Sequence, residues 1–191
     1  MKIINKEFHK TTNQIQSETL DIEAAKKNTS AFEVLYNRYH EKIFRYLYTR
    51  VDNQHLAADL CSQVFYKAML NINNYSYKGV PFSSWLYRIA FNEMNMHFRK
   101  NSKERTINID SENIFELEEV IEEDNSEENK ALLLSALSGL PDEQLSLIEM
   151  RFFEKMSFQE IAQIMGITEN NAKVKVYRTL DKMKKIFKIK S

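Results

Sequence analysis

The chain has 191 residues, 43% of them hydrophobic, and its 27 Lys and Arg balance its 27 Asp and Glu. Only three Gly and two Pro interrupt it, which favours a helical protein over a sandwich or barrel of short strands. The single cysteine excludes a disulfide framework, and no apolar run approaches the roughly 20 residues of a membrane span. Because the first residues also lack the apolar core of a secretory signal, we expect a cytoplasmic, all-α protein without membrane insertion.

The zero net charge hides a strong segregation of charge along the chain. Residues 30–100 carry nine basic and five acidic side chains, whereas residues 101–130 carry three basic and eleven acidic ones. Residues 143–191 are basic again, with ten cations against six acids. Two basic blocks joined by an acidic one are compatible with binding to a nucleic acid, which the net charge alone would argue against.

The first part of the chain is predicted to form helices. Residues 1–29 are polar and weakly patterned, so we expect a partly ordered extension with a helix only from about Ser17. From Ser30 apolar residues recur at helical spacing for some twenty residues, and a second long helix follows. The apolar positions of these two helices are Phe32, Leu35, Tyr36, Tyr39, Ile43, Leu47 and Val51, and then Leu56, Leu60, Val64, Ala68 and Ile72.

A loop rich in Asn, with Gly79 and Pro81, separates these helices from a third predicted helix over 82–100. Aromatic rings and cations alternate through this region, a pattern suited to holding unpaired bases and neutralising their phosphates. Trp85 has apolar neighbours that favour a core role, whereas Tyr75 and Tyr77 in the polar loop are better stacking candidates. The aromatic and basic candidates are Tyr75, Tyr77, Lys78, Trp85, Arg88, Arg99 and Lys100.

The acidic stretch 101–130 has the composition of an exposed linker. Its apolar residues Ile114, Phe115, Leu117, Val120 and Ile121 could form a short helix that docks elsewhere. A last compact block begins near Ala131 with ALLLSALSGLP, where Gly139 and Pro141 separate two helices.

The stretch SFQEIAQIMGITENNAKVKVYRTL predicts two helices joined by a tight turn. Ser157 and Glu160 form a capping box at the start of the first helix, over 158–165. Gly166 stands where that helix must stop with positive φ, and Thr168, with Asn171 three residues on, begins the second helix.

The second helix of this pair has two stripes. Its apolar stripe comprises Ala172, Val176, Leu180, Met183 and Phe187, and a polar stripe of Asn171, Lys175, Arg178 and Lys182 is expected on the opposite face. Residues 168–191 contain eight Lys or Arg and two acids. This pattern predicts a helix-turn-helix whose second helix offers amides and cations to a DNA major groove; the alternative is an ordinary helical hairpin with a solvated basic face.

No catalytic or metal site is predicted. His9, His40, His55 and His97 are scattered, and the sequence has neither an HExxH motif nor a Gly-rich phosphate loop. Cys61 lies in an apolar helical pattern and is interpreted as a buried small hydrophobe. We therefore expect a non-enzyme that needs no cofactor and no metal.

Several segments together resemble one family. Four segments of the chain are similar to the two-domain sigma factors of the extracytoplasmic function (ECF) group of the sigma-70 family. In chain order they are AFEVLYNRYHEKIFRYLYTR, HLAADLCSQVFYKAM, FSSWLYRIAFNEMNMHFRK and LPDEQLSLIEMRFFEKMSFQEIAQIMGITENNAKVKVYRTLDKM. The resemblance covers residues 30–100 and 131–187 in the same order. A helix-turn-helix alone is weakly specific, whereas its combination with the string W-L-x-x-I-A-x-N is strongly specific.

The resemblance implies an organisation with two helical domains. Residues 1–29 would be an N-terminal extension, 30–100 a sigma region 2-like domain, 101–130 the linker and 131–191 a region 4-like helix-turn-helix domain. In relatives such linkers thread through the polymerase cleft; a solvated spacer explains the composition equally well.

The resemblance also implies partners and roles. The partners would be bacterial core RNA polymerase, promoter DNA and an anti-sigma factor. A helix over 56–69 would dock on the polymerase clamp through Asp59, Leu60, Gln63 and Phe65. Ala58 replaces the first of the usual paired acids, and Ser62 and Gln63 replace the usual Q-E pair, which predicts a less charged interface.

The remaining positions of the resemblance concern promoter DNA. The loop 73–81 and the helix 82–100 would open the −10 element, with Asn92 and Arg99 matching the pattern, and Phe91 and Met96 departing from it. The helix-turn-helix would read the −35 element through Thr168, Glu169, Asn170, Asn171, Lys173, Lys175 and Arg178.

Two other classes of protein remain open on the sequence alone. One is a helix-turn-helix regulator that binds duplex DNA as a dimer without being a polymerase subunit, and it would not need residues 73–82 to be aromatic and basic. The other is an interaction module that sequesters the polymerase, and it would tolerate loss of Lys175 and Arg178.

Overall fold

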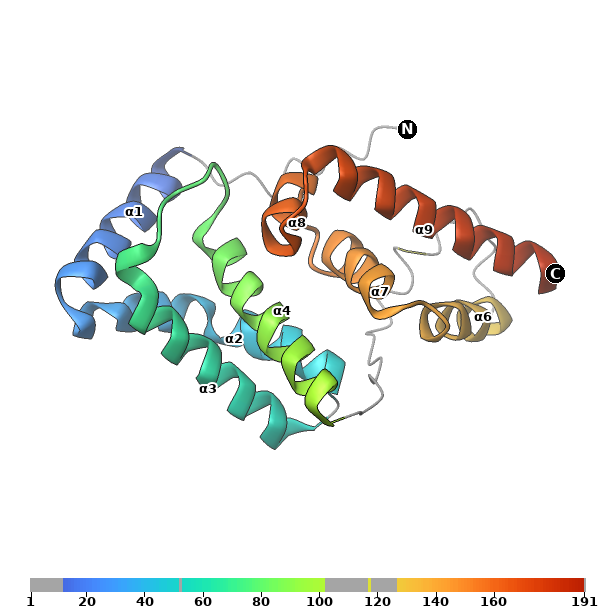
Figure 1. Ribbon diagram of the computed structural model, residues 1–191, viewed down its shortest axis with the longest axis horizontal. Helices are drawn as coiled ribbons and strands as arrows, with labels where there is room; N and C mark the ends of the chain where they lie inside the picture. Colours follow the sequence, from blue (N-terminus) through green and yellow to red (C-terminus); the bar gives the residue numbers. More distant parts are fainter. Residues whose placement is uncertain (1–11, 52, 102–116, 118–126, 191) are drawn as a thin grey trace. The chain divides into compact units, whose positions relative to one another are not determined.

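The computed structural model describes residues 12–51, 53–101, 117 and 127–190, and within these ranges it contains helices and turns but no strand (Figure 1). The all-α prediction is therefore confirmed for the described part of the chain. The chain divides into two compact units, Met1–Thr106 and Ile107–Ser191.

The described part of the first unit is a bundle of four α-helices (Figure 1). They are α1 (Thr12–Lys27), α2 (Phe32–Val51), α3 (Gln54–Asn71) and α4 (Phe82–Asn101). α2, α3 and α4 pack against one another in every pairing, and α1 packs on α2 and on η3, the short 3₁₀ turn Ile72–Asn74. The residues with no exposed surface in this core include Leu35, Ile43, Leu47, Ala57, Cys61, Val64, Ala68, Leu86, Ala90 and Met94.

Local signals in the sequence set the ends of these helices. The Asn53 side chain accepts a hydrogen bond from the Leu56 N–H (2.9 Å) and caps α3. A second 3₁₀ turn, η2 (Thr29–Ala31), connects α1 to α2, and the Asn28 side chain caps it by accepting from the Ser30 N–H (3.0 Å). Gly79, with φ 76°, turns the chain toward α4.

The second unit is built around a long helix, α9 (Glu169–Lys190). α9 packs on α6 (Glu127–Ser138), α7 (Asp142–Ile148) and α8 (Phe158–Met165). Four residues of the predicted apolar stripe of α9 are buried in this core, Ala172, Val176, Leu180 and Met183, which confirms that interpretation; the fifth, Phe187, lies outside the described side chains.

The helix-turn-helix forms as the sequence predicts. The Ser157 hydroxyl accepts from the Glu160 N–H (3.2 Å), and the Glu160 carboxylate accepts from the Ser157 N–H (2.8 Å), so the capping box is complete. Gly166 ends α8 with φ 70°. The Thr168 hydroxyl accepts from the Asn171 N–H (3.3 Å) at the start of α9.

Some features differ from the sequence-based expectations or go beyond them. α1 begins at Thr12, earlier than the expected Ser17. Its first turns are formed by mostly polar residues, which can extend a helix but give no apolar periodicity to predict it from. A π-helical turn, η4 (Glu149–Phe153), follows α7, and Lys155 has a positive φ of 53°. Of the short helix expected within the linker, only Leu117 is described; it is helical and buried, and its neighbours lie outside the described residues.

Candidate nucleic-acid interface

The exposed surface of α9 carries most of the predicted contact residues. Asn170, Asn171, Lys173 and Arg178 are all exposed, whereas the opposite face of the helix is buried. Thr168 and Glu169, at the start of the helix, are exposed as well. The end that a recognition helix directs at base edges is therefore open to solvent in this unit.

Two cations of the predicted polar stripe, Lys175 and Lys182, form hydrogen bonds with side chains of α7. The Lys175 Nζ donates to the Glu143 carboxylate of α7, and the Lys182 Nζ donates to the Gln144 side-chain oxygen (3.3 Å). Lys175 is accordingly half-buried. The polar stripe thus divides: Asn171 and Arg178 face solvent, and the two lysines lie at the border with α7.

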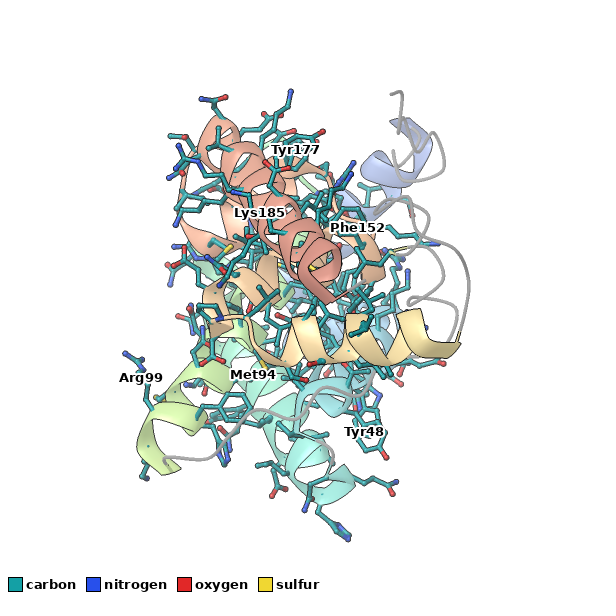
Figure 2. All side chains as sticks on the ribbon, turned by 90° about the vertical axis from the view of Figure 1, so that its right-hand side faces the viewer. Tyr48, Met94, Arg99, Phe152, Tyr177 and Lys185 are labelled. Carbon is teal, nitrogen blue, oxygen red and sulfur yellow. The ribbon has the colours of Figure 1, made fainter. Side chains whose placement is uncertain are left out.

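Two exposed apolar residues on α9 were not among the predicted contacts. Val174 is 36% exposed and Tyr177 is 48% exposed, and Figure 2 labels Tyr177 and Lys185 along this helix. An apolar side chain in the major groove can contact the methyl group of thymine. The sequence could have indicated these two residues, because both lie outside the apolar stripe of α9 and among its polar residues.

A cluster around Arg151 supports the turn that leads into α8. The Arg151 guanidinium lies over the Phe158 ring (4.6 Å to its centre), and its Nη1 donates to the Met156 carbonyl (2.7 Å). Burial lowers the pKa of Arg151. The Phe158 ring in turn contacts the Tyr177 ring, with 6.1 Å between centres, so this cluster links the start of α8 to the exposed face of α9.

In the first unit the loop before α4 closes over an aromatic cluster. The Tyr75 ring lies 5.0 Å from the Phe82 ring and 5.2 Å from the Trp85 ring, between centres. Tyr75 and Trp85 are half-buried, while Tyr77, at 54% exposed, and Lys78 face solvent. Burial, followed by the nearby charge of Glu18, raises the pKa of Tyr75, whose hydroxyl stays protonated. Tyr77 is therefore the more accessible stacking surface.

The predicted contacts on α4 lie on one stripe. Trp85, Arg88, Asn92 and Arg99 follow one another at intervals of three, four and seven residues, which places them on one side of an α-helix. Leu86, Ala90 and Met94, all buried, occupy the other side. Asn92, Arg99 and Lys100 are exposed, and Figure 2 shows Arg99 projecting from the end of the helix.

Comparison with known proteins identifies both units. The sigma-70 region 2 model matches residues 35–104, and the sigma-70 region 4 model matches residues 130–183. The chain is 34% identical over 154 residues to the ECF RNA polymerase sigma factor BldN of Streptomyces coelicolor, covering 78% of this chain and 58% of BldN. It is 30% identical over 160 residues to the RNA polymerase sigma factor SigV of Bacillus subtilis, covering 83% of this chain and 93% of SigV. The chain belongs to the sigma-70 family of RNA polymerase sigma factors, in its ECF group.

A solved structure has the same fold as this sigma factor. The structure of CnrH in complex with the cytosolic domain of CnrY superposes with a TM-score of 0.61 at 17% identity, covering 92% of this chain and 99% of that one. The matches to the two family models and to the sigma factor relatives confirm the resemblance stated from the sequence.

Region 2 of this sigma factor also contains α3, the helix expected to dock on the polymerase. Asp59 and Gln63 are exposed, whereas Leu60 and Phe65 are buried in the core of the unit. Tyr66 and Leu70, which the sequence analysis did not single out, are 60% and 59% exposed. The accessible surface of α3 therefore includes two of the four predicted residues together with these two apolar neighbours.

Other kinds of site are not seen in the described part of this sigma factor. Among those residues, no three His, Cys, Asp or Glu side chains gather as metal ligands would. Burial raises the pKa of the Cys61 thiol to about 11, so it is neutral near pH 7. None of the described helices is long and apolar enough to cross a membrane.

Proposed function

We propose that this sigma factor binds core RNA polymerase through α3, opens the −10 element with the loop 73–81 and α4, and reads the −35 element with α9. The observation that carries the proposal is that the family matches and the exposed polar stripes occur in the same two units. The region 2 and region 4 matches fall on separate units, and each unit presents an exposed polar stripe on one helix. We assign residues 30–100 to the first domain, 131–191 to the second, 101–130 to the linker and 1–29 to the N-terminal extension.

Promoter opening in this proposal is a binding process without a catalytic residue. The exposed ring of Tyr77 stacks on an unpaired base, an interaction worth about 1–3 kcal/mol. Lys78, Arg99 and Lys100, all exposed, neutralise the phosphates of the same strand, with Arg88 and Asn92 on the stripe between them. These contacts offset the few kcal/mol that unstacking of bases costs, so this chain needs no ATP hydrolysis.

Recognition of the −35 element is assigned to the N-terminal half of α9. The exposed amides of Asn170 and Asn171 suit adenine edges, and Lys173 and Arg178 suit phosphate or guanine. Thr168 and Glu169 lie at the entry of the same surface. Lys175 binds Glu143 in this structure, so its contact with DNA requires that ion pair to open or to be shared.

The protein partners follow from the same surfaces. We assign to the core polymerase the exposed side of α3, which includes Asp59, Gln63, Tyr66 and Leu70. An anti-sigma factor is the further partner we propose, because covering this side of α3 would prevent docking. Both partnerships place the protein in the cytoplasm.

The competing function is a regulator that binds duplex DNA without the polymerase. Such a protein requires a helix-turn-helix but not the region 2 match over 35–104, nor the exposed Tyr77 and Lys78 ahead of α4. These features favour the sigma factor function.

The test is transcription by purified, sigma-free bacterial core polymerase on a fragmented genomic library, with and without this protein, followed by mapping of transcript 5′ ends. We expect new starts that share two spaced sequence elements. No new starts, together with sequence-specific DNA binding by the protein alone, would instead establish the duplex-binding regulator.

A further inference from the structure

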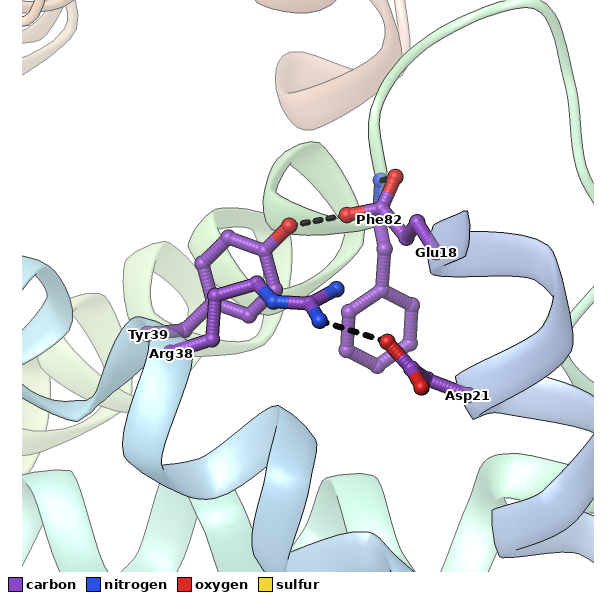
Figure 3. Close-up of polar contacts among 5 residues, drawn as sticks. All are labelled: Glu18, Asp21, Arg38, Tyr39 and Phe82. Atoms are coloured by element: carbon purple, nitrogen blue, oxygen red, sulfur yellow. Dashed lines mark hydrogen bonds and ion pairs between the residues drawn. The ribbon is translucent and has the colours of Figure 1, made fainter. Parts of the chain in front are cut away.

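The N-terminal helix α1 places a buried carboxylate at the base of the loop assigned to promoter opening. Glu18 is 4% exposed. One of its oxygens accepts from the Tyr39 hydroxyl of α2, and the other accepts from the backbone N–H of Phe82 (3.3 Å), as Figure 3 shows for the residues involved. Burial of a carboxylate is costly unless hydrogen bonds compensate it, so this residue ties three helices at one point.

The Phe82 N–H is a structurally sensitive partner. Phe82 is the first residue of α4, and the first N–H groups of a helix have no acceptor within the helix itself. A carboxylate at that position satisfies one of them and interacts favourably with the positive end of the helix dipole. Pro81, which precedes Phe82, has no backbone N–H, so the Phe82 N–H is the first that can bind the carboxylate. Glu18 therefore fixes the point at which the loop ends and α4 begins.

The same contact extends into the loop through aromatic packing. The buried Phe82 ring lies 5.9 Å from the Tyr39 ring, 5.0 Å from the Tyr75 ring and 5.4 Å from the Trp85 ring, between centres. α1 and the loop also share a small pocket, lined by Glu18, Thr19, Ile22, Glu23, Lys26, Tyr75 and Tyr77. The position of Tyr77 thus depends on how α1 is seated.

α1 is attached to α2 by a second contact, through an arginine whose charge also interacts with Tyr39 and Glu18. The Asp21 carboxylate accepts from the Arg38 guanidinium (2.5 Å) on the same side of α1 (Figure 3). This ion pair is partly exposed and includes no residue of the loop or of α4. Asp21→Ala therefore serves as a control that weakens the attachment of α1 while keeping the Glu18 carboxylate and its donors on Tyr39 and Phe82.

We propose that Glu18 is a positioning residue for promoter opening, which holds the Phe82 N–H and the Tyr39 hydroxyl so that the loop 73–81 presents Tyr77 to unpaired bases. The inference rests on the proposed role of this loop in opening the −10 element. It gives α1, which precedes the region 2 match, a part in that step.

The experiment uses the full-length chain bound to core polymerase at one of the promoters mapped as described above. It compares Glu18→Ala, Glu18→Gln and Asp21→Ala with the natural protein by permanganate reactivity of unpaired thymines, by affinity for core polymerase and by thermal unfolding. We expect Glu18→Ala to lower the opened fraction by about five- to tenfold at unchanged core affinity. Glu18→Gln, which keeps an acceptor for the Phe82 N–H, should restore most of it, and Asp21→Ala should open the promoter normally.

Opening by Glu18→Ala at the natural level, or an equal loss of opening in Asp21→Ala, would overturn the inference. If Glu18→Ala does not fold, Tyr39→Phe, which removes only the donor hydroxyl, takes its place, with an expected loss of about threefold. Tyr77→Ala distinguishes the role of the loop in promoter opening from the positioning role of Glu18. A normal opening with Tyr77→Ala refutes the role of the loop itself, whereas defective opening with Tyr77→Ala but not with Glu18→Ala refutes only the positioning role.

Discussion

At the scale of single residues, the exposed surface of α9 combines three chemistries. Asn170 and Asn171 provide amides, Arg178 provides a cation, and Val174 provides an apolar contact. Cations neutralise phosphates whatever the sequence, whereas an apolar contact to a thymine methyl depends on one base. Val174 and Arg178 should therefore contribute to binding in experimentally separable ways.

We predict that Val174→Ala weakens holoenzyme binding to the −35 element by about 1 kcal/mol without changing its salt dependence. Replacing each thymine of the element by deoxyuridine, which lacks the methyl group, tests this contact. Replacement of the one thymine that Val174 contacts should weaken binding of the natural protein but not of Val174→Ala. Arg178→Ala serves as the comparison and should lower the salt slope by about one. Equal sensitivity of the natural protein and Val174→Ala to every deoxyuridine would refute the methyl contact.

At the scale of elements, the helix-turn-helix depends on a few backbone positions. The capping box of Ser157 and Glu160 begins α8, and Gly166 ends it in the left-handed region. A residue with a side chain is strained at that φ. The turn fixes how α8 leads into α9, so its glycine supports the orientation of the surface that we assign to the −35 element.

We predict that Gly166→Ala destabilises the second unit by about 1–2 kcal/mol, seen as a lower unfolding temperature of the full-length chain. Gly139→Ala is the matched control. A Cβ there would lie 3.6 Å from the Ser135 carbonyl oxygen, which is an ordinary contact, and Gly139 is not among the glycines with positive φ. It should therefore change stability little. An equal effect of the two substitutions would contradict the conformational argument.

The elements also show which features local sequence can predict. Capping, the positive φ of Gly166 and the apolar stripe of α9 depend on residues a few positions apart, and all were predictable. The contact of Lys175 with Glu143 and the burial of Phe65 depend on tertiary packing, which a local pattern does not contain. The same holds for Glu18, whose hydrogen-bond donors on Tyr39 and Phe82 lie 21 and 64 residues away. The π turn after α7 left no recognised signal.

At the scale of the whole molecule, we assign two steps of initiation to the two units. The first unit, with the loop 73–81 and α4, is assigned to opening, and the second unit, with α9, is assigned to placement on duplex DNA. An exposed residue from each unit can test this division, because neither Tyr77 nor Arg178 belongs to a core. Substitutions at these positions should impair different steps while leaving both units folded.

The most direct measurement compares promoter occupancy and permanganate reactivity for holoenzymes carrying the natural chain, Tyr77→Ala or Arg178→Ala. We expect the holoenzyme with Tyr77→Ala to occupy the promoter but to open a smaller fraction of the bound complexes. Arg178→Ala should lower occupancy, while the complexes that do form are opened to the natural extent. Loss of occupancy and opening in the same proportion in both variants would contradict the division of labour between the two units.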